Sequence, residues 1–232
     1  MKLDQVVPWG RTAGEYQRMF ALDEGDLRRS ILGVADGPAS FNAEWSARGG
    51  RVVSVDPLYQ FTARQIEARF EAVLPQVLAA TQATHDAFVW DELRSLEELE
   101  RRRRRALGTF LADYETGSQL GRYVAAGLPR LPLADGQFDL ALCSHYLFTY
   151  SELLDADAHA AAILEMARVA RDVRVFPLAD MFAGGPSPHL PAVLERLSAA
   201  GLTVRIARVP YEFQRGANEM LVVERPTAVN DR

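Results

Sequence analysis

A turn of small residues and a later aspartate form the first group that could do chemistry. The turn reads Gly33-Val34-Ala35-Asp36-Gly37, and its small side chains let a ligand approach the backbone. Asp56 lies about 20 positions further on, a spacing at which nucleotide-binding folds place an acid beside a ribose. Its carboxylate can accept hydrogen bonds from both ribose hydroxyls. We therefore expect a nucleoside-containing ligand, bound by Gly33, Ala35, Asp36, Gly37, Asp56 and Pro57.

Both acids also have structural interpretations. Asp36 can shape the turn by bonding its own backbone, and ligand binding and turn formation both stay open for it. Asp56 can cap a helix. We favour ribose binding for Asp56, because its place after a strand, its spacing and the turn all agree.

A β-α-β unit is needed to position these residues. The apolar run at 30–34 is too short for a helix and predicts a buried strand. A short helical pattern follows, with Ser40 or Asn42 as its candidate cap. The β-branched run at 52–55 predicts the second strand, with Asp56 at its carboxyl end.

A serine and a histidine directly follow the apolar run at 138–143. Parallel sheets bind ligands at the carboxyl ends of their strands, so we expect Ser144 to contact the ligand and His145 to be a catalytic candidate. The ordinary pKa of histidine, about 6.5, suits a base at neutral pH. Strand alternation leaves open which of the two faces the pocket, and His145 can instead hold a loop in shape. Tyr150 is the second catalytic candidate.

Aromatic side chains near the strand ends predict the wall of a substrate pocket, with core packing as the alternative. The expected substrate-binding residues are Tyr59, Tyr146 and Tyr211.

The turn and a later segment together resemble one enzyme family. The spacing Gly33-x-Ala35-x-Gly37-x-Ala39 and the segment Leu-Pro-Leu-Ala-Asp-Gly-Gln-Phe-Asp-Leu-Ala-Leu at 131–142 resemble motifs of class I S-adenosylmethionine-dependent methyltransferases of the bacterial small-molecule type. The resemblance covers residues 30–225. It implies a Rossmann-like α/β sheet of seven strands in the order 3-2-1-4-5-7-6, with the last strand antiparallel and helices on both faces. It also implies S-adenosyl-L-methionine as the cofactor and methyl transfer to an O, N, S or C atom of a small molecule.

The chain departs from the family pattern at the first strand. The acidic residue usual at the end of that strand is Gly33 here, and Ala35 and Ala39 stand where the family has glycine. Two other functions therefore stay open. One is methylation of RNA or protein, and the other is a noncatalytic protein that binds S-adenosylmethionine or acts as a scaffold.

The chain divides into three parts. Residues 1–29 predict a helical lid, in which the planar fork of Arg11 suits a methionine carboxylate, and a simple cover for the core is the alternative. Residues 30–225 form the methyltransferase-like domain, and 226–232 a flexible tail. The stretch at about 62–118 is longer than one crossover helix needs, so it predicts an inserted helical cap that restricts the acceptor to small molecules.

Capping patterns start both helices of this insertion. Thr62-x-x-Gln65 has the spacing of a capping box, and Ser95-x-x-Glu98 marks the second start. Pro75 lies inside the first helical pattern and is expected to kink or end it.

Five consecutive arginines at 101–105 invite a nucleic-acid interpretation. A helix spreads successive side chains round its circumference, and glutamates lie within pairing reach, so we expect a solvated, ion-paired surface. The net charge of −5 does not favour nonspecific binding of nucleic acid. We expect a small-molecule partner, neither nucleic acid nor a membrane, and a monomer or homodimer.

Metal chemistry and a membrane anchor have little support. The four histidines and Cys143 show no spacing typical of metal ligands. No run of about 18 apolar residues and no signal-peptide pattern occur. A single cysteine fits a reducing compartment, so we expect a cytoplasmic protein without a metal site.

Overall fold

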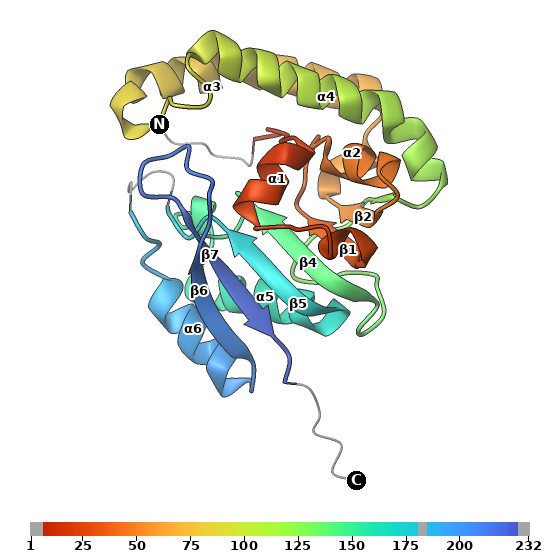
Figure 1. Ribbon diagram of the computed structural model, residues 1–232, viewed down its shortest axis with the longest axis vertical. Coiled ribbons are helices and arrows are strands. Elements are labelled where there is room, and N and C mark those ends of the chain that lie inside the picture. The colour runs from red at the N-terminus through yellow and green to blue at the C-terminus, as the bar shows by residue number, and fades with distance from the viewer. Residues whose placement is uncertain (1–6, 181–184, 227–232) are drawn as a thin grey trace.

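A mixed β-sheet forms the centre of the computed structural model, which describes residues 7–180 and 185–226 (Figure 1). Within these residues the sheet has seven strands in the order β3-β2-β1-β4-β5-β7-β6. The strands are β1 (Ser30–Val34), β2 (Arg51–Val55), β3 (Tyr123–Val124), β4 (Phe138–Ser144), β5 (Ala170–Phe176), β6 (Thr203–Arg208) and β7 (Glu219–Glu224). All pairs are parallel except those of β7, which runs antiparallel to β5 and β6. The predicted strand order and orientation are confirmed.

Helices cover both faces of the sheet, as expected. The face with α1 (Ala13–Met19) and α2 (Phe41–Ala47) buries Ile31, and the face with α5 (Ala156–Val169) and α6 (Leu190–Ala199) buries Leu32. Successive strand residues point to opposite faces. The central strands β1 and β4 are mostly apolar because helices cover both of their faces, whereas the edge strand β6 is largely exposed.

Two long helices lie side by side across the end of the sheet to which the parallel strands point (Figure 1). They are α3 (Ala63–Ala83) and α4 (Leu96–Gln119). Thr62 and Gln65 form the expected capping box of α3, and the Ser95 side chain accepts from the Glu98 amide at the start of α4. Phe70 of α3 and Phe110 of α4 are fully buried in one aromatic and aliphatic cluster between the helices.

Two local predictions need comment. Of the two outcomes expected at Pro75, an end of the helix is wrong: α3 runs from Ala63 to Ala83 through it, because its capped start and its packing against α4 offset one lost backbone hydrogen bond. Neither candidate cap serves α2. Ser40 occupies the cap position but donates to the Glu44 carboxylate, and Asn42 lies inside the helix and donates to Ser54 Oγ at 3.1 Å.

The predicted terminal segments are described only in part. Residues 1–6 of the predicted lid and 227–232 of the predicted tail lie outside the described residues. The described part of the lid contains α1, which starts with a capping box between Thr12 and Glu15.

The arginine run contains one buried member, which corrects the prediction that all five are solvated. Arg103 is 1% exposed and forms two hydrogen bonds of 2.7 and 2.8 Å to Glu15, which is equally buried. Position 103 falls on the side of α4 that faces α1. Arg101, Arg102 and Arg104 make exposed or half-exposed ion pairs with glutamates, as expected.

Glu15→Gln is the first test of this arrangement. The variant keeps the shape of the side chain but leaves the Arg103 guanidinium buried without a counter-charge, a change that typically costs about 3–5 kcal/mol. We expect urea denaturation to show a loss of that size. Glu98→Gln is the matched control, because it removes an exposed pair with Arg101 and should cost less than about 1 kcal/mol.

The same pair predicts a pH dependence. Burial acts to raise the pKa of Glu15, but Arg103 overcomes it and lowers that pKa from 4.5 to about 2. The folded pKa is below the unfolded one, so the stabilisation is present above about pH 4.5 and is lost as the pH falls toward 2. Wild-type stability should fall more steeply over this range than that of Glu15→Gln. Equal slopes would contradict the assignment.

Candidate functional site

A cavity of about 1140 Å³ lies at the carboxyl ends of the parallel strands. Its floor is made by the turn after β1, by Asp56 and Pro57 after β2, and by Ser144 and His145 at the end of β4. One face of α3 lines the opposite side. The cavity is thus at the place where open α/β sheets bind ligands, beside the reversal of strand order between β1 and β4.

Asp56 ties the small-residue turn to the end of β2. Its Oδ2 accepts from the Gly37 amide at 2.8 Å, and its Oδ1 accepts from the Leu58 amide at 2.7 Å, which caps η2 (Pro57–Gln60). Burial raises the pKa of Asp56, against the effect of the two amide hydrogen bonds. A carboxylate has about four acceptor sites, so two remain for a ligand.

The turn keeps a glycine-like backbone although one glycine is replaced. Ala35 has φ = 56° and Gly37 has φ = 55°, both in the left-handed region. The Ala35 amide donates to the Val55 carbonyl at 2.9 Å, which holds the turn against β2. Ala35 therefore adopts a conformation that costs an L-residue roughly 1–2 kcal/mol.

Asp36 supplies a carboxylate at the place where the first strand lacks one. A Cβ atom on Gly33 would lie 1.8 Å from Asp36 Oδ2, so the Asp36 side chain fills the space of a side chain at position 33. Tyr16 Oη donates to its Oδ1 at 2.7 Å and Ser54 Oγ to its Oδ2 at 2.6 Å. Burial raises the pKa of Asp36 to about 6, against the effect of these two hydrogen bonds.

Arg11 brings an unneutralised positive charge to the cavity. Its Nη1 donates to the Trp9 carbonyl at 3.2 Å, and its buried Nε has no partner among the described residues. Glu15 is held by Arg103, so this buried cluster has two guanidiniums and one carboxylate. Burial and then Arg103 lower the pKa of Arg11. A partly buried charge without a counter-charge is costly, so the cluster favours an anionic ligand group beside Arg11.

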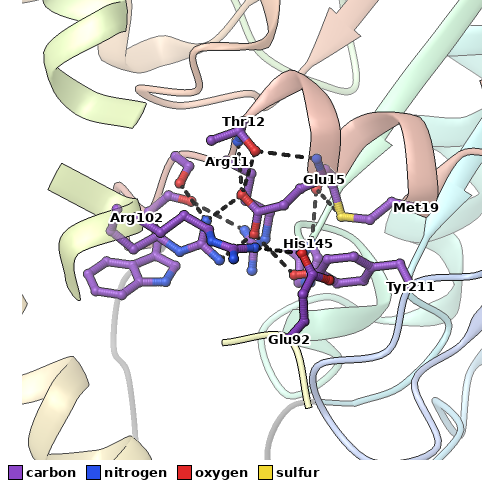
Figure 2. A network of polar contacts seen from close by, with 12 residues as sticks. Arg11, Thr12, Glu15, Met19, Glu92, Arg102, His145 and Tyr211 are labelled. Atoms are coloured by element: carbon purple, nitrogen blue, oxygen red, sulfur yellow. Dashed lines mark hydrogen bonds and ion pairs between the residues drawn. The ribbon is translucent and has the colours of Figure 1, made fainter. Parts of the chain in front are cut away.

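His145 lies next to this cluster, as Figure 2 shows with Arg11, Glu15 and Tyr211 around it. Its Nδ1 is 2.9 Å from Ser144 Oγ, which donates to Met19 Sδ at 3.8 Å. In the tautomer that carries the imidazole proton on Nδ1, this contact is a hydrogen bond to Ser144 Oγ and Nε2 is an acceptor. The backbone of His145 is also in the left-handed region, at φ = 51°.

The expected ordinary pKa of His145 is wrong. Burial, and then the Arg11 and Arg103 guanidiniums, lower the pKa of His145 well below 6.5. The imidazole is therefore neutral over the whole neutral range. It can accept a hydrogen bond, but it is a weaker base than an ordinary histidine.

Most of the proposed site residues meet at this cavity, and two do not. The lining includes Arg11, Ala35, Asp36, Gly37, Asp56, Pro57, Ser144, His145, Tyr146, Tyr150 and Tyr211. Gly33 lies beneath Asp36 and outside the lining. Tyr59 is also outside it, because its ring packs against Phe110 and its hydroxyl donates to the Gly37 carbonyl at 2.8 Å. We therefore withdraw Gly33 as a contact to cofactor and Tyr59 as a contact to substrate.

Other residues of the site were missed from the sequence. Tyr16 and Ser54 hold Asp36, and the Glu15–Arg103 pair lies beside Arg11. The Thr12-x-x-Glu15 spacing was an available signal for the start of α1, although it does not reveal the partner of Glu15. The pairing with Arg103 spans 88 positions and has no local signature.

Two further properties concern the described part of the chain only. Residues 7–180 and 185–226 contain no group of three or more His, Cys, Asp or Glu side chains that could hold a metal ion. None of the helices in these ranges combines the length and the apolar character needed to cross a membrane.

A search against protein-family models found no match. The chain is 31% identical over 226 residues to the uncharacterized protein MJ0045 of Methanocaldococcus jannaschii, covering 97% of this chain and 99% of that protein. This chain belongs to the MJ0045 family. The match to MJ0045 covers nearly the whole length of both proteins, so it includes the residues of the helical insertion as well as those of the sheet.

Solved structures place this family member in a wider fold group. It matches the mitomycin 7-O-methyltransferase MmcR at a TM-score of 0.50 and 14% identity, over 92% of this chain and 53% of that chain. It also matches the magnesium protoporphyrin IX methyltransferase ChlM of Synechocystis PCC 6803 at a TM-score of 0.48 and 11% identity, over 92% and 80% of the two chains. Together with the strand order, the likeness to MmcR shows the class I methyltransferase fold.

The strained turn leads to a prediction about Ala35. Ala35→Gly removes a Cβ from a residue at φ = 56° and should raise the unfolding free energy by about 1 kcal/mol. Gly37→Ala is the matched opposite change, since its added Cβ meets no atom within 4 Å and its cost is conformational only. In thermal melts, the melting temperature of Ala35→Gly should be higher than that of the wild type, and the melting temperature of Gly37→Ala should be lower. A destabilised Ala35→Gly would contradict the strain.

Proposed function

We propose that this protein binds S-adenosyl-L-methionine and transfers its methyl group to a small-molecule acceptor. The observation that carries the proposal is Asp56 at the end of β2, hydrogen-bonded to Gly37 of the turn and open to the cavity. The Asp56 carboxylate, which can accept hydrogen bonds from ribose hydroxyls, is thus linked to a turn that a nucleoside can approach.

The residues of the cavity fit the parts of this cofactor. Asp56, Gly37 and Pro57 would hold the ribose side, while the Asp36 carboxylate would meet the ammonium group of the methionine part. Arg11, whose buried Nε has no partner among the described residues, would meet its carboxylate. Ser144 completes the floor. When bound, the cofactor supplies a sulfonium methyl group that is already electrophilic.

His145 and Tyr150 would act on the acceptor. With Nδ1 bonded to Ser144, His145 presents Nε2 to accept a proton or a hydrogen bond from the nucleophile. Tyr150 lines the cavity, and its Oη accepts from the Val7 amide at 3.2 Å, which leaves its own proton free to donate. Tyr146 and Tyr211 would line the acceptor space. α3 lines the side of the cavity opposite its floor, which supports a small acceptor over a macromolecule.

A pair of ligands tests the cofactor assignment. S-adenosylhomocysteine has the whole frame of the cofactor, whereas 5′-methylthioadenosine keeps adenine and ribose but lacks the amino-acid part. Asp56→Asn should weaken both by at least about tenfold, because two hydrogen bonds to a charged acceptor are affected. Arg11→Met should lower the affinity for S-adenosylhomocysteine by a similar factor and leave the affinity for 5′-methylthioadenosine within about twofold of the wild-type value.

Calorimetric titration distinguishes the outcomes. Failure of the wild type to bind S-adenosylhomocysteine would reject the proposed function. If Asp56→Asn leaves both affinities unchanged, Asp56 is not the ribose ligand. If Arg11→Met weakens both ligands equally, Arg11 does not read the carboxylate.

His145→Asn tests the proposed proton acceptor. Asparagine tolerates a positive φ better than alanine does, so the strand end should keep its shape. We expect unchanged affinity for S-adenosylhomocysteine and a loss of roughly 10²–10⁴-fold in methyl transfer. The pKa of His145 lies well below 6.5, so its protonation should reduce the wild-type rate only at pH values below that and not near neutrality. Turnover of His145→Asn at the wild-type rate would remove His145 from the mechanism. Binding without turnover in the wild type would support a scaffold.

A further inference from the structure

The cavity extends beyond the part assigned to the cofactor, along α3. Its volume of about 1140 Å³ exceeds the roughly 300–1,000 Å³ usual for a small-molecule pocket. Lining residues of α3 recur from Ala72 to Thr81, a distance of about 14 Å along the helix. This suits a small molecule lying along the helix rather than a compact ion.

This face of α3 is mostly apolar, with Gln76 and Arg69 as its polar side chains besides threonine. Val73, Val77 and Ala80 line the cavity and are only half-buried, so part of their apolar surface has no cover. Two threonines on the same side have no hydroxyl proton left for a ligand, because Thr81 Oγ1 donates to the Val77 carbonyl at 2.9 Å and Thr84 Oγ1 to the Ala80 carbonyl at 3.0 Å. Buried apolar surface facing a cavity favours an apolar ligand.

An aromatic wall faces the same space. Phe213, in the loop between β6 and β7, stacks on Phe88 with ring centroids 4.7 Å apart, and both line the cavity. The Val89 amide donates to the Phe213 carbonyl at 2.7 Å and the Arg215 amide to the Ala87 carbonyl at 2.8 Å. These backbone bonds fix the wall to the segment between α3 and α4. A rigid aromatic surface favours a ring, which can stack on it or meet it edge to face.

Charge is sparse on this side. Away from the cofactor end, the charged lining residues that the structure describes are Arg69 and Glu152, and both are exposed. The Arg69 guanidinium lies 3.6 Å above the Phe61 ring. The positive charge of Arg11 lies on the cofactor side, where it acts on His145.

We propose that the face of α3 formed by Ala72, Val73, Val77 and Ala80, together with Phe88 and Phe213, binds the ring system of an uncharged aromatic small molecule. Its polar group would point toward His145. That this molecule is the methyl acceptor rests on the proposed function, whereas the binding site does not.

Two neighbouring alanines provide a matched test with 2-naphthol as the probe. Ala80 lines the cavity, whereas Ala79 is exposed and lies outside the lining. Ala80→Asp places a charge against the ring and should lower the affinity for 2-naphthol by at least about tenfold. Ala79→Asp should leave this affinity within about twofold of the wild-type value. Ala80→Phe fills the same space without a charge and should also weaken binding by at least about tenfold. Calorimetry is run with and without S-adenosylhomocysteine.

Each outcome decides the proposal. Saturable 2-naphthol binding that is at least about tenfold tighter than that of 2-naphthalenesulfonate supports an uncharged aromatic ligand. No binding of 2-naphthol to the wild type, a preference for the sulfonate, or equal effects of the Ala79 and Ala80 variants would overturn it. If 2-naphthol behaves as expected but S-adenosylhomocysteine does not bind, the aromatic site stands and the proposed function fails. The reverse result rejects the aromatic site alone.

Discussion

The buried ion pair between Glu15 and Arg103 holds together the parts of the chain that surround the cavity. Arg103 belongs to α4 and Glu15 to α1, and the hydroxyl of Tyr211 reaches Glu15 at 3.2 Å from the loop between β6 and β7. Arg103 also donates to the Gly10 carbonyl, next to Arg11. Removing two charges from water is costly unless they pair closely, so the pair strongly disfavours arrangements in which these elements separate. It also leaves Arg11 as the charge that a ligand must balance.

The turn after β1 shows how a degenerate motif can keep its geometry. Ala35 takes the positive φ of a glycine, and its conformational cost is offset where Asp56 and the Val55 carbonyl hold the turn to β2. The carboxylate missing at position 33 returns from position 36, since Gly33 leaves the space that the Asp36 side chain occupies. Gly33 and Asp36 therefore share one space in the site, so a side chain at position 33 would require Asp36 to move.

The cavity has acidic side chains on one side and a basic side chain on another, and this distribution of charge underlies the proposed ligand binding. Asp36 and Asp56 provide the acidic side, and Arg11 the basic side, where burial and nearby guanidiniums keep His145 neutral. Such a division suits a zwitterionic amino-acid group lying between the two sides. The apolar face of α3 lies beyond both and offers little to a charged ligand, so different walls of one cavity suit different parts of the two proposed ligands.

The sequence by itself determined the strands, their order through the family motifs, the acid at the end of β2 and the capped starts of α3 and α4. These features depend on residues a few positions apart or on a motif of known geometry, and local rules capture them. Tertiary structure alone decided which of five arginines is buried, because its partner lies 88 positions away. It also decided the pKa of His145, since burial and two distant guanidiniums set it. The burial and the ionisation state of a side chain depend on all the segments packed around it, so they cannot be predicted from one segment of sequence.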